Sequence, residues 1–232
     1  MVIFVHSGSL AIGAAVFNQL DDPAAVLEVG QEKASAYLEA MNNAANFAFA
    51  NRLSLGLMAT KALSEVLGRS LSSRLVYDAP HNFIEQTYSG DFRHRKGATP
   101  AQGPEGSHDS HTFPSGHPVL IPGSMGTESW VLAGSGSPLA LESTAHGAGR
   151  ALSRTKAAAA TPNLDGLTIV TPIDEQKMKA LGRSDILAEQ QRSLREEAPG
   201  AYKDLESVIS STTEAGAARQ IARLKPLLTI KG

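Results

Sequence analysis

Three of the seven histidines stand where a short apolar or small-residue stretch gives way to a tight loop. His6 is followed by Ser-Gly-Ser, His81 by Asn82, and His146 by Gly-Ala-Gly-Arg. Small residues let the backbone approach a ligand closely, so these three imidazoles are well placed to converge on one cleft. Three separately satisfied core imidazoles explain the pattern equally well, because no helical or hairpin spacing fixes them as ligands.

A second candidate site is residues 122–129, which read Pro-Gly-Ser-Met-Gly-Thr-Glu-Ser. This segment offers small residues, free backbone N–H groups and hydroxyls within one turn, which suits an anionic or nucleotide ligand. Taken alone, a plain connecting loop is the simpler interpretation. The sequence has no G-x-x-x-x-G-K-[ST] motif and no G-x-G-x-x-G after a strand, so it supports neither a P-loop NTPase nor a Rossmann enzyme.

The other histidines lie in or beside a polar segment, residues 97–116, that is rich in Pro, Gly, Ser and His. This composition predicts a surface loop rather than a linker between domains. Solvated surface positions are therefore expected for the four histidines concerned, His94, His108, His111 and His117.

Hydrophobic periodicity predicts the elements that must position these residues. A helical pattern covers residues 31–68, with Gly68 as a stop, and indicates one bent helix or two. Its apolar face consists of Leu55, Met58, Ala62, Leu63 and Val66. Strands are expected at residues 2–5, 75–77, 119–121, 130–132 and 167–170, and helices return after Asp174, with breaks at residues 199–200 and 226. The order predicts an α+β fold with a sheet core and flanking helices.

Composition bounds the class of protein. The 232 residues are 42% hydrophobic and 19% charged, which is typical of a soluble protein with one large domain. No stretch approaches eighteen apolar residues and no signal peptide opens the chain, so a cytoplasmic location without membrane partners is expected. The absence of cysteine excludes disulfides and thiolate ligands, and the net charge of -2 supplies no general attraction to nucleic acid.

Several motifs together resemble one family, the RtcB RNA ligases. The resemblance runs in order through residues 45–52, 94–99, 121–127, 146–150 with Ser153 and Arg154, 197–204 and 230–232. The resemblance spans the chain from His6 to Gly232. Residues 1–232 are therefore expected to be the C-terminal portion of an RtcB-like catalytic domain.

The resemblance implies a site residue by residue. His146 matches the family's nucleophile, which forms a GMP-histidine adduct from GTP, and His6 and His81 match two histidines that bind Mn²⁺. In a common metal site their ring nitrogens would lie roughly 3–4 Å apart. The implied guanylate contacts are Asn82, Pro122, Gly123, Ser124, Met125, Ser129, Gly147, Ala148, Gly149, Tyr202 and Lys231. His146 is therefore expected to face a cleft shared with residues 122–125.

The implied activity is GTP- and Mn²⁺-dependent RNA ligation, in tRNA splicing or RNA repair. RNA ends bearing a 3′-phosphate, or a 2′,3′-cyclic phosphate opened to it, would be joined to 5′-hydroxyl ends. Family members carry further metal ligands in a long N-terminal portion that this sequence does not match, and Leu10 and Ala11 replace the usual arginine and glycine. A missing segment or an activating protein would then be needed.

Two other functions stay open at this point. The chain could be a non-catalytic RtcB paralogue that binds guanine nucleotide or RNA without ligating, which the replacement by Leu10 favours. A metal-dependent phosphoesterase is the third reading, but it needs a metal cage built wholly from protein ligands, which this set of histidines does not supply.

Overall fold

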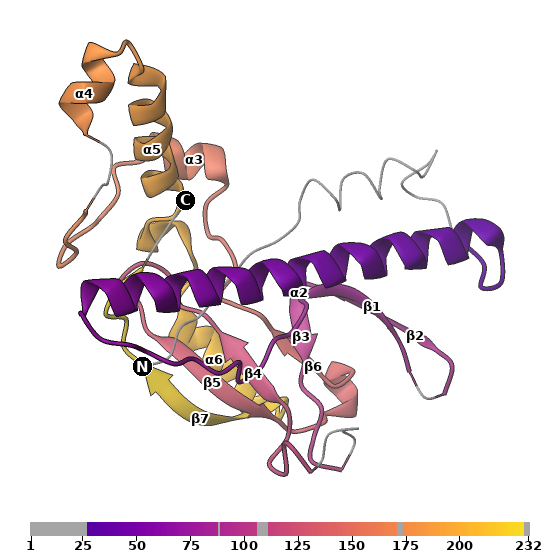
Figure 1. Ribbon diagram of the computed structural model, residues 1–232. Helices are drawn as coiled ribbons and strands as arrows, with labels where there is room; N and C mark the ends of the chain where they lie inside the picture. Colours follow the sequence, from indigo (N-terminus) through magenta and orange to yellow (C-terminus); the bar gives the residue numbers. More distant parts are fainter. Residues whose placement is uncertain (1–26, 88, 106–110, 171–173, 230–232) are drawn as a thin grey trace. The chain divides into compact units, whose positions relative to one another are not determined.

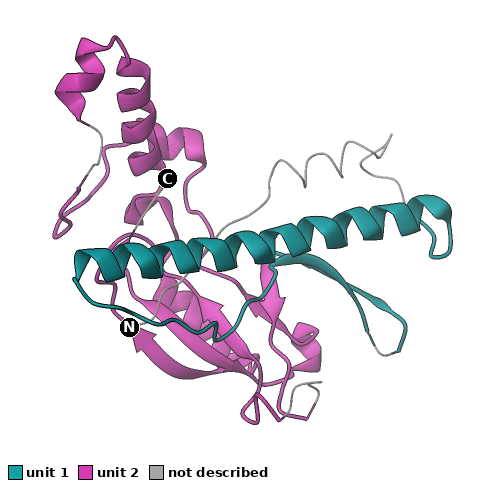
Figure 2. Cartoon of the chain, viewed as in Figure 1, with its two compact units in different colours: residues 1–96 teal, residues 97–232 magenta. Residues whose placement is uncertain are grey.

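The computed structural model describes residues 27–87, 89–105, 111–170 and 174–229 (Figure 1). The chain divides into two compact units, residues 1–96 and residues 97–232 (Figure 2). Helices and small antiparallel sheets occur together, so the predicted α+β class is confirmed. None of the described helices is both long and apolar enough to cross a membrane.

The first unit is dominated by α2, a single continuous helix over Glu32–Val66. The sequence predicted these bounds closely but left open whether the helix was bent or split in two. Gly68 adopts a φ of +62°, a left-handed conformation that glycine takes at little cost, and the Arg69 N–H donates to the Ser64 carbonyl at 3.2 Å. The predicted stop is therefore a left-handed glycine just past the helix end.

The apolar face predicted for α2 is not buried within the described residues. Leu55, Met58 and Val66 are 39%, 66% and 83% exposed, and Ala34 is the one buried residue of the helix. On the same helix, Arg52 pairs with Asp78 at 2.7 Å and lies over the Phe49 ring. The periodicity predicted the helix correctly, but it did not predict whether other elements cover the apolar side chains.

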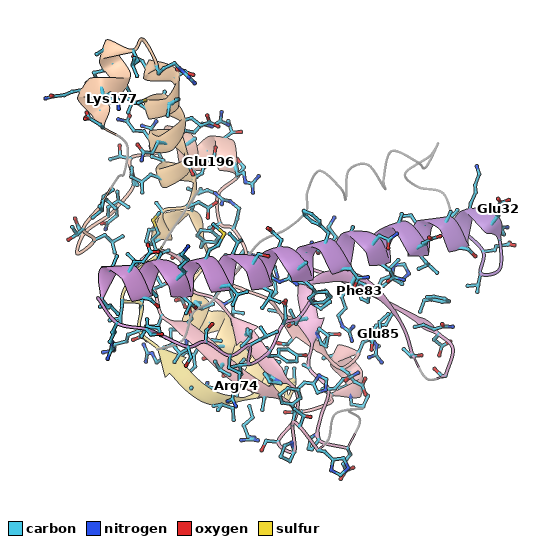
Figure 3. The ribbon with its side chains drawn as sticks, viewed as in Figure 1. Glu32, Arg74, Phe83, Glu85, Lys177 and Glu196 are labelled. Carbon is cyan, nitrogen blue, oxygen red and sulfur yellow. The ribbon has the colours of Figure 1, made fainter. Side chains whose placement is uncertain are left out.

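A hairpin that the sequence did not predict completes the first unit. β1 (Asn82–Gln86) pairs antiparallel with β2 (Phe92–Lys96). Phe83 and Glu85 project from β1 (Figure 3), and Glu85 pairs with Arg95, a buried arginine. The polar Phe-Arg-His-Arg-Lys sequence of β2 hid this strand, and it places His94, expected beside a loop, on a strand.

The second unit is built on a three-stranded antiparallel sheet. Its strands are β4 (Pro118–Ile121), β5 (Ser129–Gly134) and β7 (Ala218–Leu224), in the order β4-β5-β7. Residues Val119, Ile121 and Leu132 are fully buried, and they pack with Ile209 of α6 (Leu205–Glu214). Burying each such side chain contributes about 1.5–3 kcal/mol. The strands predicted at residues 119–121 and 130–132 are thus the core of this unit.

A second strand pair lies in the same unit. β3 (Ala98–Pro100) pairs antiparallel with β6 (Ser143–Ala145). The expected loop at residues 97–116 is therefore wrong at its start, where Thr99 and Ala101 are buried. His117 is half-buried: its backbone N–H donates to the Gln102 carbonyl, and its ring packs edge-on against Phe113.

Shorter elements connect these parts. They are η1 (Pro138–Ala140), α3 (Arg154–Ala159), α4 (Glu175–Ala180), α5 (Ser184–Glu196) and η2 (Pro199–Ala201). The helices predicted after Asp174 are confirmed, and Asp174 caps α4 through the Lys177 N–H at 2.9 Å. Three predictions were wrong: residues 75–77 and 167–170 form no strand, and residues 218–224, expected to be helical, form β7. Leu75, Val76 and Val170 are exposed, and these two apolar runs pair with no described strand.

Candidate functional site

His146 follows directly on β6 and lies beside the residue that precedes β3. Ala98 is opposite Ala145 in the ladder, so Gly97 and His146 each stand one residue outside it. The Nδ1 atom of His146 lies 2.7 Å from the Gly97 carbonyl oxygen. Gly97 has a φ of +65°, and a Cβ atom there would meet the imidazole at 3.5 Å. The strand pair and the left-handed glycine together fix one edge of the ring.

This contact decides which ring nitrogen carries hydrogen. A carbonyl oxygen only accepts hydrogen bonds, so Nδ1–H of His146 is the donor to Gly97. In the neutral ring the lone pair then lies on Nε2. An imidazole oriented in this way has the electronic form required of a nucleophile or a metal ligand.

The loop after His146 is tied to the segment around Tyr202. Arg150 and Tyr202 form an isolated antiparallel bridge. The Lys203 N–H donates to the Gly149 carbonyl at 3.1 Å, and the Ala151 N–H donates to the Ala201 carbonyl at 2.9 Å. Tyr202 lies far from His146 in the sequence, and these backbone hydrogen bonds fold its segment back onto the His146 loop.

The Tyr202 hydroxyl is held by two charged side chains. It donates a short hydrogen bond to Oε2 of Glu197 and accepts one from Nη1 of Arg150 at 3.3 Å. Burial and, next, the hydrogen bond and charge of Glu197 raise the pKa of Tyr202 to about 12, against the smaller opposing effect of Arg150. The phenol therefore stays protonated at neutral pH, with its hydrogen directed to Glu197.

The turn at residues 122–129 is held together by its own hydroxyls. The Gly123 N–H donates to Oγ of Ser129 at 2.9 Å, and the Ser124 N–H donates to Oγ1 of Thr127 at 2.6 Å. A Cβ atom at Gly123 would come within 2.3 Å of the Glu128 carbonyl, and Met125 is buried. Two amides that the sequence predicted to be free for an anion are thus already used, which leaves a rigid, small-residue turn.

Comparisons with known proteins bear on this geometry. The family description "tRNA-splicing ligase RtcB" matches residues 1–232. The chain belongs to the RtcB family. It is 40% identical over 259 residues to "RNA-splicing ligase RtcB" of Mycobacterium tuberculosis, covering 99% of the chain and 56% of that protein. It is 35% identical over 274 residues to "tRNA-splicing ligase RtcB" of Pyrococcus furiosus, covering 100% of the chain and 26% of that protein.

A third relative is eukaryotic. "RNA-splicing ligase RtcB homolog 2" of Entamoeba dispar is 32% identical over 256 residues, covering 99% of the chain and 47% of that protein. The chain thus spans between about a quarter and just over half of the length of these RtcB relatives.

The residues predicted from the RtcB resemblance are divided between the two units. His146, residues 147–149, Tyr202 and the turn at 122–129 belong to residues 97–232, whereas His81 and Asn82 belong to residues 1–96. Asn82 begins β1 opposite Lys96. His6 and Lys231 lie outside the described residues. The approach of His6 to His81 therefore stays a prediction. The cleft expected between His146 and residues 122–125 stays a prediction as well.

The described part of the chain offers no metal cage of its own. In residues 27–87, 89–105, 111–170 and 174–229, no three His, Asp or Glu side chains gather as ligands for an ion. His81 of the predicted pair is within these ranges and His6 is outside them. The described residues therefore do not by themselves fit the Mn²⁺ that the family implies.

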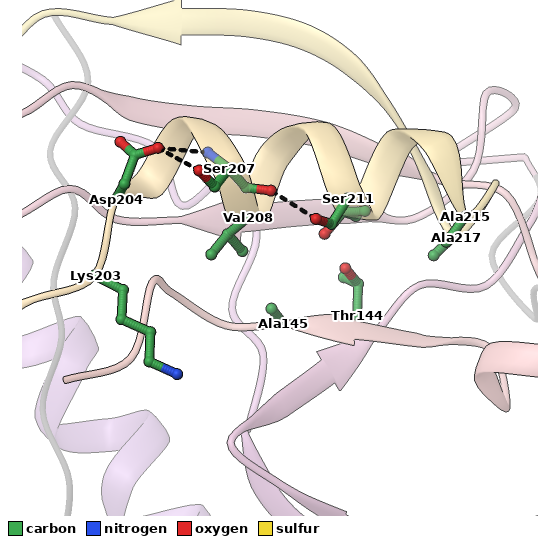
Figure 4. Close-up of a pocket in the computed structure, with 10 residues that line it drawn as sticks. Thr144, Ala145, Lys203, Asp204, Ser207, Val208, Ser211, Ala215 and Ala217 are labelled. Carbon is green, nitrogen blue, oxygen red and sulfur yellow. Dashed lines mark hydrogen bonds between the residues drawn. The ribbon is translucent and has the colours of Figure 1, made fainter. Parts of the chain in front are cut away.

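A shallow pocket of about 590 Å³ lies between β6 and α6 (Figure 4). Thr144 and Ala145 line one side, and Lys203 stands near the start of α6. Asp204 caps α6, accepting from both the N–H and the hydroxyl of Ser207 at 2.9 and 2.5 Å. None of the residues predicted from the sequence is among the ten that line it, although it begins next to His146 and next to Tyr202.

Three residues that contact the predicted site residues were not singled out from the sequence: Gly97, Arg150 and Glu197. All three occur inside the motifs that carry the RtcB resemblance, in His-Arg-Lys-Gly-Ala-Thr, His-Gly-Ala-Gly-Arg and Glu-Ala-Pro-Gly-Ala-Tyr. No spacing rule links residues 47 to 52 positions apart, as the Arg150 contacts with Glu197 and Tyr202 are. Only the tertiary pairing shows which residues they contact.

Proposed function

We propose that this chain carries the nucleotidyl-transfer chemistry of an RNA ligase, with His146 as the residue that is guanylylated. The observation that carries the proposal is the hydrogen bond from Nδ1 of His146 to the Gly97 carbonyl. That bond leaves the lone pair of the neutral ring on Nε2, as attack on phosphorus requires. Membership of the RtcB family supports the same assignment.

The reaction proceeds by three displacements at phosphorus. Nε2 of His146 forms a bond to the α-phosphorus of GTP while the bond to the β-phosphate oxygen breaks, releasing pyrophosphate. The GMP group then passes to an RNA 3′-phosphate, and a 5′-hydroxyl of a second RNA end displaces GMP. Ends with a 2′,3′-cyclic phosphate are first opened by water to the 3′-phosphate. Forming the covalent GMP-histidine intermediate divides one difficult reaction into easier steps.

The nucleotide contacts are proposed at Asn82, Pro122, Gly123, Ser124, Met125, Ser129, Gly147, Ala148, Gly149, Tyr202 and Lys231. The internal hydrogen bonds of the turn at Gly123 and Ser124 support a preformed surface there. The hydrogen bond from Tyr202 to Glu197 supports a second preformed contact, a protonated tyrosine side chain held in one orientation. Preformed contacts of this kind bind a ligand without the cost of ordering them.

Manganese enters the proposal through the family, with His6 and His81 as two of its ligands. Mn²⁺ prefers mixed nitrogen and oxygen ligands in six-coordinate geometry, so further ligands would come from residues outside the described ranges, from a longer polypeptide or from a partner. The described residues supply no set of three ligands for the ion. When bound, such an ion stabilises negative charge on phosphate oxygens.

The substrates and setting are proposed on the same basis. The RNA ends carry a 3′-phosphate or 2′,3′-cyclic phosphate and a 5′-hydroxyl, in tRNA splicing or RNA repair, with a cytoplasmic location. A missing N-terminal segment or an activating protein completes the site. The second candidate function is a non-catalytic paralogue that binds guanine nucleotide or RNA without ligating, and Leu10 in place of the family's arginine favours it.

The deciding experiment detects the covalent intermediate. The chain is incubated with GTP labelled at the α-phosphate and with Mn²⁺, and an acid-labile label is sought on protein. His146→Asn should abolish the label, a loss of at least about a thousandfold for removal of a nucleophile. His111→Asn is the matched control, because His111 is exposed and lies outside every predicted contact.

Two results would contradict the proposal. A label that persists in His146→Asn would show that another residue is the nucleophile. A chain that binds GTP but acquires no label, both alone and when supplied with the N-terminal portion of a longer relative, would establish the non-catalytic alternative. A ligation assay on matched RNA ends, with and without that portion, then measures sealing. We expect the chain alone to seal at least about a thousandfold more slowly, since losing a metal's charge stabilisation costs several kcal/mol.

A further inference from the structure

All three nitrogens of the Arg150 guanidinium are used, and their acceptors come from three places in the fold. Nε donates to the Leu152 carbonyl at 3.1 Å, within the arginine's own loop. Nη2 donates to the carbonyl of Glu196 at 2.5 Å, at the end of α5, where Figure 3 marks Glu196. Nη1 reaches the Glu197 carboxylate at 3.4 Å and the Tyr202 hydroxyl at 3.3 Å.

The same guanidinium also covers the Tyr202 ring. Its central carbon lies 5.1 Å from the ring centroid, within the range of a cation–π contact. The side chains of Arg150 and Glu197 are 25% and 22% exposed, so water only partly screens their interaction. Tyr202 is thereby held at its hydroxyl by Glu197 and over its ring by Arg150.

We propose that Arg150 is a positioning residue for the guanylylation site, which holds Tyr202 in the orientation that binds the nucleotide. The inference rests on the proposed function, in which Tyr202 is a nucleotide contact. Arg150 acts through Tyr202 and Glu197 and is not itself assigned a contact with the reacting phosphate. It links the last residue of the His-Gly-Ala-Gly-Arg motif to the tyrosine of the Glu-Ala-Pro-Gly-Ala-Tyr motif.

The geometry also says which kinetic parameter Arg150 should control. The His146 loop keeps its backbone hydrogen bonds, Lys203 to Gly149 and Ala151 to Ala201, whatever side chain stands at position 150. Loss of the guanidinium therefore frees the Tyr202 ring more than it displaces His146. A residue that contributes to binding, equally in the ground and transition states, changes KM and leaves kcat nearly unchanged.

A lysine cannot replace this arrangement. A planar guanidinium presents a fork of donors in fixed directions, whereas an ammonium is a compact point charge on a flexible stem. At Arg150 the donors point to a carbonyl of the loop, a carbonyl of α5 and the Glu197–Tyr202 pair at once. Arg150→Lys should therefore behave more like Arg150→Ala than like the parent chain.

The test is the kinetics of label transfer from α-labelled GTP to the 232-residue chain in the presence of Mn²⁺. Arg150→Ala should raise KM for GTP about tenfold, as expected for the loss of charge-assisted hydrogen bonds, and change kcat by less than about threefold. Added guanidinium ion should restore part of the affinity. Arg192→Ala is the matched control, because exposed Arg192 pairs with the Glu196 side chain and does not touch Tyr202. It should match the parent.

Two kinetic results overturn the inference: an Arg150→Ala chain with parental KM, or one whose kcat alone falls, which would mean that the whole nucleophile loop had moved. If the parent chain forms no adduct, the proposed function fails instead, and NMR of the Tyr202 ring decides the inference separately. In Arg150→Ala, but not in Arg192→Ala, the ring resonances of Tyr202 should shift toward those of an exposed tyrosine, while the Lys203 and Ala151 amides keep parental hydrogen exchange. Parental Tyr202 ring resonances in Arg150→Ala overturn the inference.

Discussion

Apolar side chains meet opposite fates in helix α2 and in the β4-β5-β7 sheet. Ile121 and Leu132 of the sheet are fully buried, whereas Met58 and Val66 of the helix are 66% and 83% exposed. Both sets were predicted from hydrophobic periodicity. The difference shows that a periodic pattern predicts an element and the face it can bury, while the burial itself depends on a second element being there to cover that face.

The largest expected effect separates the two regions by stability. Leu132→Ala should lower the free energy of unfolding by about 2–5 kcal/mol, because it leaves a cavity in a closed core. Leu57→Ala, at a position of α2 that is 56% exposed, should change it by less than about 0.5 kcal/mol. Urea unfolding followed by circular dichroism measures both. Equal losses would mean that α2 is packed as tightly as the sheet.

A smaller effect is expected from adding one methyl group at the end of β5, the central strand of the sheet. A Cβ atom on Gly134 would lie 2.3 Å from the backbone carbonyl carbon of Ala101, so the two backbone segments must move apart. Gly134→Ala should therefore cost about 1–3 kcal/mol. Gly200→Ala is the control, because a Cβ atom there meets nothing within 4 Å. A parental unfolding midpoint for Gly134→Ala would show that the approach of the two backbones is looser than described.

The smallest effect concerns the helix ends and depends on pH. Asp204 caps α6 through Ser207, whereas Gln31 makes no side-chain cap on α2. Hydrogen bonds from Ser207 lower the pKa of Asp204. The native state therefore binds the proton less readily than the unfolded state, and the stabilisation is present at neutral pH and lost as pH falls below the ordinary carboxylate range.

The test compares unfolding midpoints of Asp204→Asn and the parent across pH 3 to 7. Asparagine keeps the cap but cannot titrate, so the difference between the two should shrink as the pH falls. On α2, where Gln31 makes no side-chain cap, Gln31→Asp introduces a capping carboxylate and should raise the helical content of the chain modestly. A constant difference at all pH values would mean that Asp204 does not titrate in this contact.

The candidate site divides along similar lines. His146 and Tyr202 could be singled out from the sequence because they occur in motifs that resemble one family. Gly97 and Glu197 could not be assigned roles, because their parts follow from β3 pairing with β6 and from the fold-back at residues 201–203. The short strands β3 and β6 also have too few residues for an alternating pattern to be recognised.

The strands β2 and β7 were missed for a related reason. Their sequences, Phe-Arg-His-Arg-Lys and Ala-Arg-Gln-Ile-Ala-Arg-Leu, carry charged residues and little apolar alternation. Each forms a strand because a neighbour offers a complete edge for backbone pairing, β1 in one case and β5 in the other. The free energy comes from pairing and cross-strand contacts, which no local pattern contains.

By itself, the sequence determined the family, the α+β class, the extent of α2 and the two strands that form the core, because long motifs and strong periodicity are local properties. Only the tertiary structure decided which ring nitrogen of His146 bears the hydrogen and what holds Tyr202 in place. Those outcomes depend on atoms brought together from distant parts of the chain. A hydrogen bond between residues 49 positions apart has no signature in either residue's neighbourhood.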